Sequence, residues 1–269
     1  MRNKYCLLLI ALFAWSSTFA QYGETIRSGR PGQAIGPFTA GARVLQVQYG
    51  INYGQAGYHS LRDRFKQSRH FGSDIVVRVG ITERFEMSVA TAYLNEKMSR
   101  DSVIDLNEGI GSFSVRARSN IYVGEGARPT VGFQVGLSLP VISFDFRPKQ
   151  VAPKLTVMTG QRFGKRWGLT TNWGVSWDGI NEYPIAFYVV NLGFDISSKV
   201  STFIEHYASM DKFNWLGSVD GGFAYLATPD LQLDVLGGYG PLRMNDDWFV
   251  SLGVSWRIRF KERVKKEKS

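Results

Sequence analysis

The residues that could carry out catalysis are few in this chain of 269 residues. Its three histidines, His59, His70 and His206, do not have the spacing of a metal site, and no phosphate-binding glycine loop is present. A lipid hydrolase would need Ser201 or Ser209 beside His206, but in an extended strand these serines share the opposite face. We therefore expect a protein that is not an enzyme, with no catalytic residues, no metal and no cofactor.

A second set of candidate residues is charged, and its members share one face of segments that alternate between polar and apolar residues. They are Asp74, Arg78, Glu86, Arg116, Arg118, Glu205, Asp234, Arg257 and Arg259. If this face lines an enclosed and hydrated interior, two hypotheses remain open. The charges pair across the interior and fill it, or the excess of arginine biases a pore toward anions and acidic solutes. The near balance of acids and bases favours pairing.

Alternation with a period of two residues predicts the strands that would position these charges. In 248–260 the even positions are all apolar, and the odd positions from Ser251 to Arg259 are serine, glycine or arginine. The segment 167–177 repeats the pattern. Further alternating segments lie at 45–53, 74–81, 85–93, 112–121, 130–139 and 231–239, with weaker ones near 154–162, 184–196, 200–209 and 217–227. The sequence therefore predicts an all-β fold of about twelve strands.

The connections between these strands fall into two alternating classes. Short turns are predicted at 82–84, 124–128, 164–166, 197–199 and 228–230, and longer polar loops at about 54–70, 95–109, 140–153, 178–183, 209–216 and 240–247. This pattern is typical of an antiparallel up-and-down barrel with tight turns at one end and long loops at the other.

The bulky apolar face is the one we expect to meet lipid, because the opposite face carries small and polar residues that suit a hydrated lumen. Ten steps of ~3.3 Å at a tilt of about 40° span ~25 Å from Trp167 to Trp177, the height of an outer-membrane apolar band. The fold predicted is thus a transmembrane barrel. Its membrane-interface aromatic residues would be Trp167, Trp177, Trp248, Trp256 and Phe260.

Four segments make up the predicted organisation. Residues 1–20 read as a Sec-type signal peptide, with Arg2 and Lys4 before a ten-residue apolar stretch and Ala20 at the cleavage site. Residues 21–43 are rich in glycine and proline, so we expect an irregular segment that lies at the periplasmic mouth or enters the lumen. Residues 44–260 form the barrel, and 261–269 form a basic C-terminal tail.

Short motifs distributed along the chain also carry a resemblance to a known family. They are IRSGRPGQ at 26–33, GPFT at 36–39, LQVQYG at 45–50, GITERFE at 80–86, DGGFAYL at 220–226, TPDLQLD at 228–234 and VSLGVSWR at 250–257. Together they resemble the predicted outer-membrane transporters associated with the meta-pathway of phenol degradation. The resemblance implies a barrel and a role in transport, but no particular solute.

The function predicted from these observations is a porin-like channel in the outer membrane of a Gram-negative bacterium, reached by Sec-dependent export. Its partners would be outer-membrane lipid, the barrel-insertion machinery, and small solutes of hydrophobic or anionic character that pass through passively. Nucleic acid is not expected as a partner, although the net charge is +9. The alternative is a structural or partner-binding barrel with a filled lumen, and a lipid hydrolase is the least favoured hypothesis.

Overall fold

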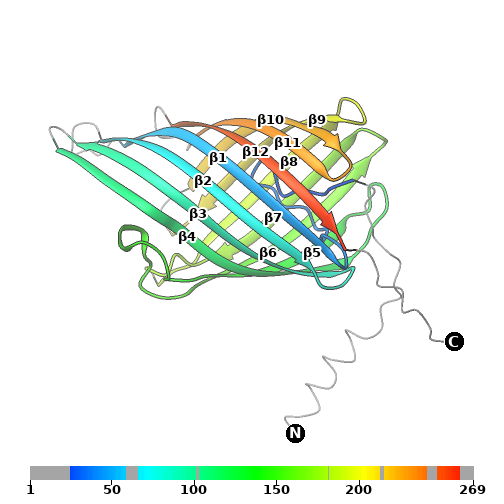
Figure 1. The fold of residues 1–269 in the computed structure, drawn as a ribbon, viewed down its shortest axis with the longest axis horizontal. Coiled ribbons are helices and arrows are strands. Elements are labelled where there is room, and N and C mark those ends of the chain that lie inside the picture. Colours follow the sequence, from blue (N-terminus) through cyan, green and yellow to red (C-terminus); the bar gives the residue numbers. More distant parts are fainter. Residues whose placement is uncertain are drawn as a thin grey trace, which may run out of the picture.

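Twelve antiparallel strands form one closed barrel in the computed structural model, which confirms the predicted fold class (Figure 1). The structure describes residues 25–58, 66–100, 103–180, 182–212, 215–240 and 247–260, so the predicted signal peptide and basic tail lie outside the described residues. The strands are β1 (Val44–Tyr58), β2 (Lys66–Gly80), β3 (Phe85–Arg100), β4 (Val103–Tyr122), β5 (Thr130–Ser138), β6 (Ala152–Phe163), β7 (Trp167–Ser176), β8 (Ile185–Asp195), β9 (Val200–Met210), β10 (Trp215–Thr228), β11 (Leu231–Tyr239) and β12 (Trp248–Arg259).

Each strand pairs with its neighbours in the sequence, and the barrel closes where β1 meets β12. The closing ladder runs in register from Val44 opposite Arg259 to Gln55 opposite Trp248. A short 3-10 helix, η1 (Phe144–Phe146), is the one helical element in the described residues, and none of their helices is long and apolar enough to cross a membrane. Closure leaves the wall of the barrel without an open edge, whereas among the described residues β4 before Ser114 pairs with β3 alone.

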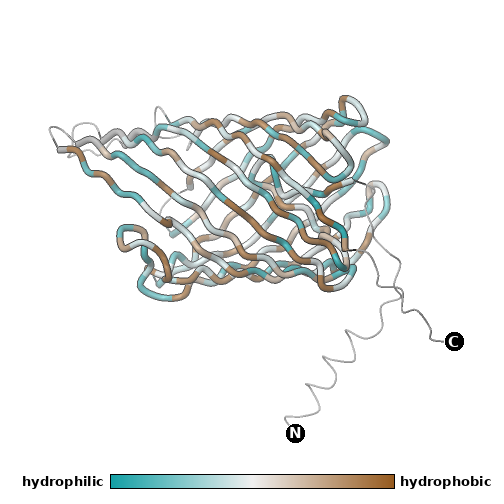
Figure 2. Tube along the Cα trace, in the orientation of Figure 1, coloured by the Kyte–Doolittle hydropathy of each residue, from teal (hydrophilic) through white to brown (hydrophobic). Residues whose placement is uncertain are grey.

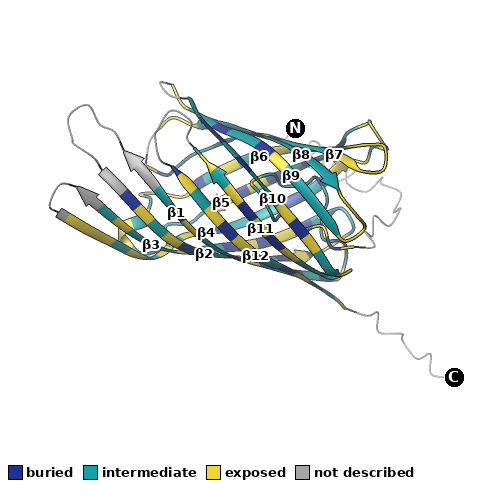
Figure 3. Ribbon diagram, turned by 90° about the horizontal axis from the view of Figure 1, so that it is seen from above, coloured by how far each residue is buried: buried dark blue, intermediate teal, exposed yellow. Residues whose placement is uncertain are grey.

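The two faces of the strands differ as the alternation predicted. In β1, Tyr49 and Tyr53 are more than 40% exposed on the outer wall, at 44% and 42%, whereas Gln46 and Gln48 are buried inside. Hydropathy and exposure change from residue to residue along the strands (Figures 2 and 3). The largest exposed side chains are apolar and the buried ones are mostly polar, which is the reverse of a water-soluble protein.

Two of the predicted long loops are wrong. The segment predicted as a loop at 95–109 is strand, because β3 runs to Arg100 and β4 begins at Val103; likewise β1 and β2 extend into the predicted loop at 54–70. Many of the side chains there are polar, but backbone pairing does not depend on apolar side chains. Asn95 donates to Glu108 across the ribbon at 3.0 Å, and the register continues beyond this pair. The β1–β4 side therefore reaches further out than the other strands (Figure 1).

Connections alternate between the two ends of the barrel; the long ones after β5, β7 and β11 lie at one end, where only two residues separate β3 from β4. The short turns follow β2, β4, β6, β8 and β10, and they share an end with the start of β1 and the finish of β12. In outer-membrane barrels short turns face the periplasm and long loops face the outside. We name the two ends accordingly, as the turn end and the loop end.

A charge placed on the outer wall should cost much more than one placed on the inner wall. Val89 of β3 is exposed on the outside, and Ala92 of the same strand borders an interior cavity. Val89→Arg is expected to lower the free energy of unfolding by about 2–4 kcal/mol, since arginine would face acyl chains near the midplane. Ala92→Arg should have a much smaller effect.

Denaturant unfolding in lipid vesicles, followed by tryptophan fluorescence, measures both variants. Equal losses for Val89→Arg and Ala92→Arg would contradict the assignment of the outer wall to lipid.

Candidate functional site

The segment 25–43 runs through the interior of the barrel, and we call it the plug segment. Its backbone is bound by inward-facing side chains of strands around the barrel. Asn172 of β7 makes two hydrogen bonds to Ile35, one to its N–H and one to its carbonyl, both 2.8 Å long. Asn120 of β4 donates to the Pro37 carbonyl at 3.1 Å. Polar lumen side chains thus give this irregular backbone the partners that a neighbouring strand would supply.

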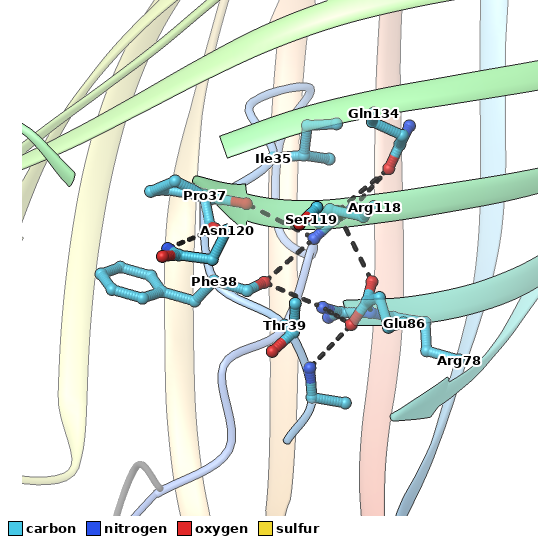
Figure 4. Close-up of polar contacts among 12 residues, drawn as sticks. Ile35, Pro37, Phe38, Thr39, Arg78, Glu86, Arg118, Ser119, Asn120 and Gln134 are labelled. Carbon is cyan, nitrogen blue, oxygen red and sulfur yellow. Dashed lines mark hydrogen bonds and ion pairs between the residues drawn. The ribbon is translucent and has the colours of Figure 1, made fainter. Parts of the chain in front are cut away.

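A buried ion cluster holds the second half of the plug segment (Figure 4). Arg78 of β2 binds both carboxylate oxygens of Glu86 of β3 at 3.0 and 2.8 Å, and Arg118 of β4 lies 3.5 Å from the same carboxylate. Glu86 also accepts a hydrogen bond of 2.7 Å from the backbone N–H of Ala40, and both arginines donate to the Phe38 carbonyl at 3.3 Å. The excess positive charge of this cluster is therefore directed onto backbone carbonyl groups of the plug segment.

Arg30 of the plug segment connects it to β2, β11 and β12. Its guanidinium lies 3.2 Å from Asp74 of β2 and 3.3 Å from Asp234 of β11, and it donates to Ser251 at 2.8 Å. The side chain fits because Gly50 and Gly253, which are opposite each other in the closing ladder, leave room for it. A Cβ at these positions would lie 2.2 and 2.3 Å from Arg30 nitrogens.

Glu205 of β9 binds the tip of the plug segment. Its carboxylate accepts hydrogen bonds from the backbone N–H groups of Gln33 and Ala34, and from the Asn191 side chain at 2.9 Å. Gly32 has a φ of 93°, and a Cβ there would lie 2.8 Å from a Glu205 oxygen. Only glycine allows both this backbone conformation and the close approach of the carboxylate.

Arg257 and Arg259 of β12 meet Asp230, in the turn between β10 and β11. The distances from the Asp230 carboxylate are 2.6 Å to Arg257 and 2.8 Å to Arg259. Arg257 also donates to the Thr25 carbonyl at 3.1 Å, so the cluster secures the plug segment at the turn end. Burial raises the pKa of Asp230, but hydrogen bonds from the two arginines outweigh it and hold this pKa below its ordinary value.

The predicted charged residues therefore belong to four separate groups. Asp74 and Asp234 bind Arg30; Arg78, Glu86 and Arg118 form the ion cluster; Glu205 binds backbone N–H groups; Arg257 and Arg259 bind Asp230. Arg116 joins none of them and donates a hydrogen bond of 3.1 Å to the Ser114 hydroxyl. The sequence analysis missed Arg30 and Asp230, which lie outside any alternating strand. Facing glycines such as Gly50 and Gly253 were a signal that something fills the lumen between them.

Three cavities lie on two sides of the plug segment. Toward the loop end are cavities of about 430 and 580 Å³, both bordered by Gln33, Ile35 and Arg116. Toward the turn end is a cavity of about 830 Å³ bordered by residues 25–27 and Phe38. No described residue borders cavities on both sides. The plug segment thus divides the lumen into an outer and an inner part.

The predicted interface aromatics lie near the two ends of the barrel. Trp167, Trp256 and Phe260 are exposed on the outside near the turn end, and Trp248 is exposed near the loop end. Trp177 is half-buried and directly follows β7. Across β7–β10 the rings of Trp173, Tyr188, His206 and Trp215 stack in sequence on the same wall, with centroids 5.5–5.9 Å apart.

The two described histidines, His70 and His206, do not lie together, and neither pairs with Ser201 or Ser209. His206 contacts the Tyr188 hydroxyl at 3.2 Å, whereas Ser201 and Ser209 border interior cavities. His70 borders the cavity of about 430 Å³, and His59 lies outside the described residues. Within the described part of the chain, no group of three or more His, Cys, Asp or Glu side chains could hold a metal ion.

Comparison with known families decides where this chain belongs. The family model described as "Putative MetA-pathway of phenol degradation" matches residues 28–258, which is nearly the whole barrel and most of the plug segment. The chain is a member of this family. The resemblance noted from the short motifs is thereby confirmed. A search of curated proteins found no match.

Solved structures similar to this family member are outer-membrane barrels. The COG4313 outer membrane channel from Pseudomonas putida F1 superposes with a TM-score of 0.66 at 12% identity, over 86% of this chain and 100% of that one. The NanC porin superposes with a TM-score of 0.53 at 12% identity, over 80% of this chain and 100% of that one. The KdgM porin superposes with a TM-score of 0.53 at 8% identity, over 78% of this chain and 98% of that one. At such low identity these similarities establish the barrel fold.

Replacing Gly32 tests how the tip of the plug segment is held. Gly32→Ala is expected to push the Glu205 carboxylate away, so that the Gln33 and Ala34 amides exchange with solvent at least about tenfold faster. Gly126→Ala is the matched control, because Gly126 also has a positive φ, of 61°, but a Cβ there would meet nothing within 4 Å. Hydrogen exchange followed by mass spectrometry measures both variants. Unchanged exchange in Gly32→Ala would contradict the role of Glu205 in binding the Gln33 and Ala34 amides.

The low pKa of Asp230 makes its contribution to stability depend on pH. Asp230→Asn should lower the free energy of unfolding by less than about 1 kcal/mol at pH 7, because the Asp230 side chain is 36% exposed and water screens its ion pairs. The stabilisation by the Asp230 carboxylate is complete above about pH 4, which is the pKa of this group in the unfolded chain. It is lost as the pH falls through the lower pKa of Asp230 in the folded protein. The melting temperatures of wild type and Asp230→Asn should therefore converge at about pH 2. A difference that persists there would rule out the carboxylate as its source.

Proposed function

We propose that this protein is an outer-membrane channel through which small solutes pass passively, with the plug segment as the restriction. The observation that carries the proposal is the pair of polar-lined lumen regions on either side of this segment, inside a closed barrel. Solutes enter porins through such lumens, and selectivity arises from width and from lining charges. Membership of a family linked to phenol degradation agrees with a role in the uptake of small molecules.

The location follows from the outer wall and from the first twenty residues. Exposed Tyr, Trp, Leu and Val side chains around the barrel would meet outer-membrane lipid, with aromatic residues at both interfaces. Residues 1–20 would direct Sec-dependent export in a Gram-negative bacterium, and the barrel-insertion machinery would then place the chain in the membrane.

The contacts of the plug segment with the wall suit a restriction that can be displaced to let solutes pass. Many contacts of this segment with the wall are hydrogen bonds and ion pairs, and Ile26 and Pro37 are its buried apolar residues. Water and polar solutes in the three adjoining cavities can replace such hydrogen bonds and ion pairs one at a time. The segment also contains no helix or strand that would have to unfold as a unit.

A barrel with a filled lumen, acting as a structural or partner-binding protein, is the second candidate. It is favoured by the division of the lumen, because no described residue borders both the outer and the inner cavities. The two candidates differ in whether solutes cross the barrel at all, and a reconstituted barrel answers this directly.

Single-channel recording in planar bilayers tests the channel. The mature chain is expected to give small, discrete steps, and deletion of residues 21–40 should raise the conductance several-fold, because the restriction is removed and the lumen is otherwise polar. Deletion of 261–269 is the control and should leave the steps unchanged.

Heat-dependent mobility on detergent gels establishes that each variant is a folded barrel. A folded full-length protein that stays silent, together with a deletion variant that conducts, would favour the filled barrel over the channel.

A further inference from the structure

The cavity of about 580 Å³ at the loop end has two cations on one wall. Arg116 of β4 and Lys154 of β6 both border it, and both are in register with Gly136 of the intervening strand β5. Because residues in register share a face of the sheet, the two side chains project to the same side. Gly136 has no side chain, so an open notch separates them; an added Cβ would make only ordinary contacts, at 3.5 and 3.8 Å.

Neither cation is bound by a carboxylate in the described residues. Arg116 donates to the Ser114 hydroxyl, and the Lys154 ammonium lies 4.2 Å from the centre of the Phe187 ring. Asp74 borders the neighbouring cavity together with Arg116, but it is bound by Arg30. This differs from Arg30, Arg78 and Arg118, each of which lies close to a carboxylate.

An aromatic and aliphatic surface adjoins the cations. The Phe187 ring of β8 lies over Gly174 of β7, where a Cβ would be 2.5 Å from a ring carbon, so the glycine permits this ring position. Ile35 of the plug segment and Leu216 of β10 border the same cavity. The cavity therefore combines positive charge with a flat apolar wall.

A buried hydroxyl group also points to a ligand. Thr156 of β6 borders the cavity and is only 1% exposed, and its Oγ1 has no hydrogen-bond partner. A buried polar atom without a partner is costly, so it is expected to bind a group that enters the cavity. Thr156 lies two residues from Lys154 on the same strand face.

We propose that this pocket binds a small aromatic carboxylate of the benzoate class; the inference rests on the proposed function and names a solute for it. The carboxylate would be bound by Arg116 and Lys154, with the Thr156 hydroxyl as a further donor, and the ring would lie against Phe187 and Ile35. A neutral phenol would leave both cations without a counterion. An inorganic anion would leave the aromatic wall in contact with water.

Isothermal titration of the detergent-solubilised mature protein tests the pocket without requiring conduction. Benzoate is expected to bind at least about tenfold more tightly than benzamide, which lacks the charge, and than acetate, which lacks the ring. Lys154→Gln and Arg116→Gln should each weaken benzoate binding about tenfold, as expected for the loss of one charge-assisted contact. Phe187→Leu should weaken the binding of benzoate several-fold and leave the binding of acetate unchanged.

Two further variants separate the pocket from the general charge of the lumen. Arg162→Gln removes a cation at the turn end, where Arg162 pairs with Asp195 at 2.8 Å, and it should leave benzoate affinity unchanged. Gly136→Asp places a carboxylate between the two cations and should abolish benzoate binding while both cations remain. Benzamide binding as tightly as benzoate, or an equal loss in Arg162→Gln, would overturn the proposal.

The outcomes for pocket and channel are distinct. Charge-dependent benzoate binding by a barrel that never conducts supports the pocket and counts against the channel. Conduction without charge-dependent benzoate binding supports the channel and overturns the pocket.

Discussion

Every backbone N–H and C=O group at membrane depth must find a partner within the protein, and the rest of this structure depends on that constraint. A bilayer core offers no water, so an open sheet would expose unpaired groups at its two edges. The ladder between β1 and β12 removes both edges at once. Closure also encloses an interior, and the strict alternation of strands then divides each strand between lipid and that interior. The charged side chains of the strands face this interior because the bilayer core offers no water to solvate them.

An enclosed interior creates a second requirement, because charges that lose contact with water need partners. In this barrel the partners come largely from outside the strands. Arg30 lies between Asp74 and Asp234, and backbone N–H groups of the plug segment bind Glu86 and Glu205. Glycines on the strands make room for these contacts. The wall and the plug segment are therefore complementary, in that each satisfies polar groups the other would leave unpaired.

The sequence predicted the strands of the wall and an irregular segment at 21–43, but not the contacts that the plug segment makes with the wall. Alternation in 248–260 identified β12 and the facing of Arg257, because a period of two residues translates directly into two faces. The stretch 95–109 was predicted as a loop because many of its residues are polar, yet its described residues continue β3 and β4 in register. Arg30 lies in a segment without periodicity, so its contacts with Asp74 and Asp234 depend on where the chain enters the barrel. Glu86 was predicted to face the interior, but the Ala40 N–H that donates to it is a backbone group that no residue pattern identifies.

The plug segment also determines which charges remain for a solute. The acids that it binds, Asp74, Asp234 and Glu205, come from β2, β11 and β9, whereas Arg116 and Lys154 of β4 and β6 are left without a carboxylate among the described residues. The near balance of acids and bases among the predicted lumen charges therefore does not describe the outer part of the lumen. Because bound acids no longer offset the cations there, an arriving anion meets a more positive surface than composition alone suggests. One short segment thus sets both the width of the lumen and the sign of its outer charge.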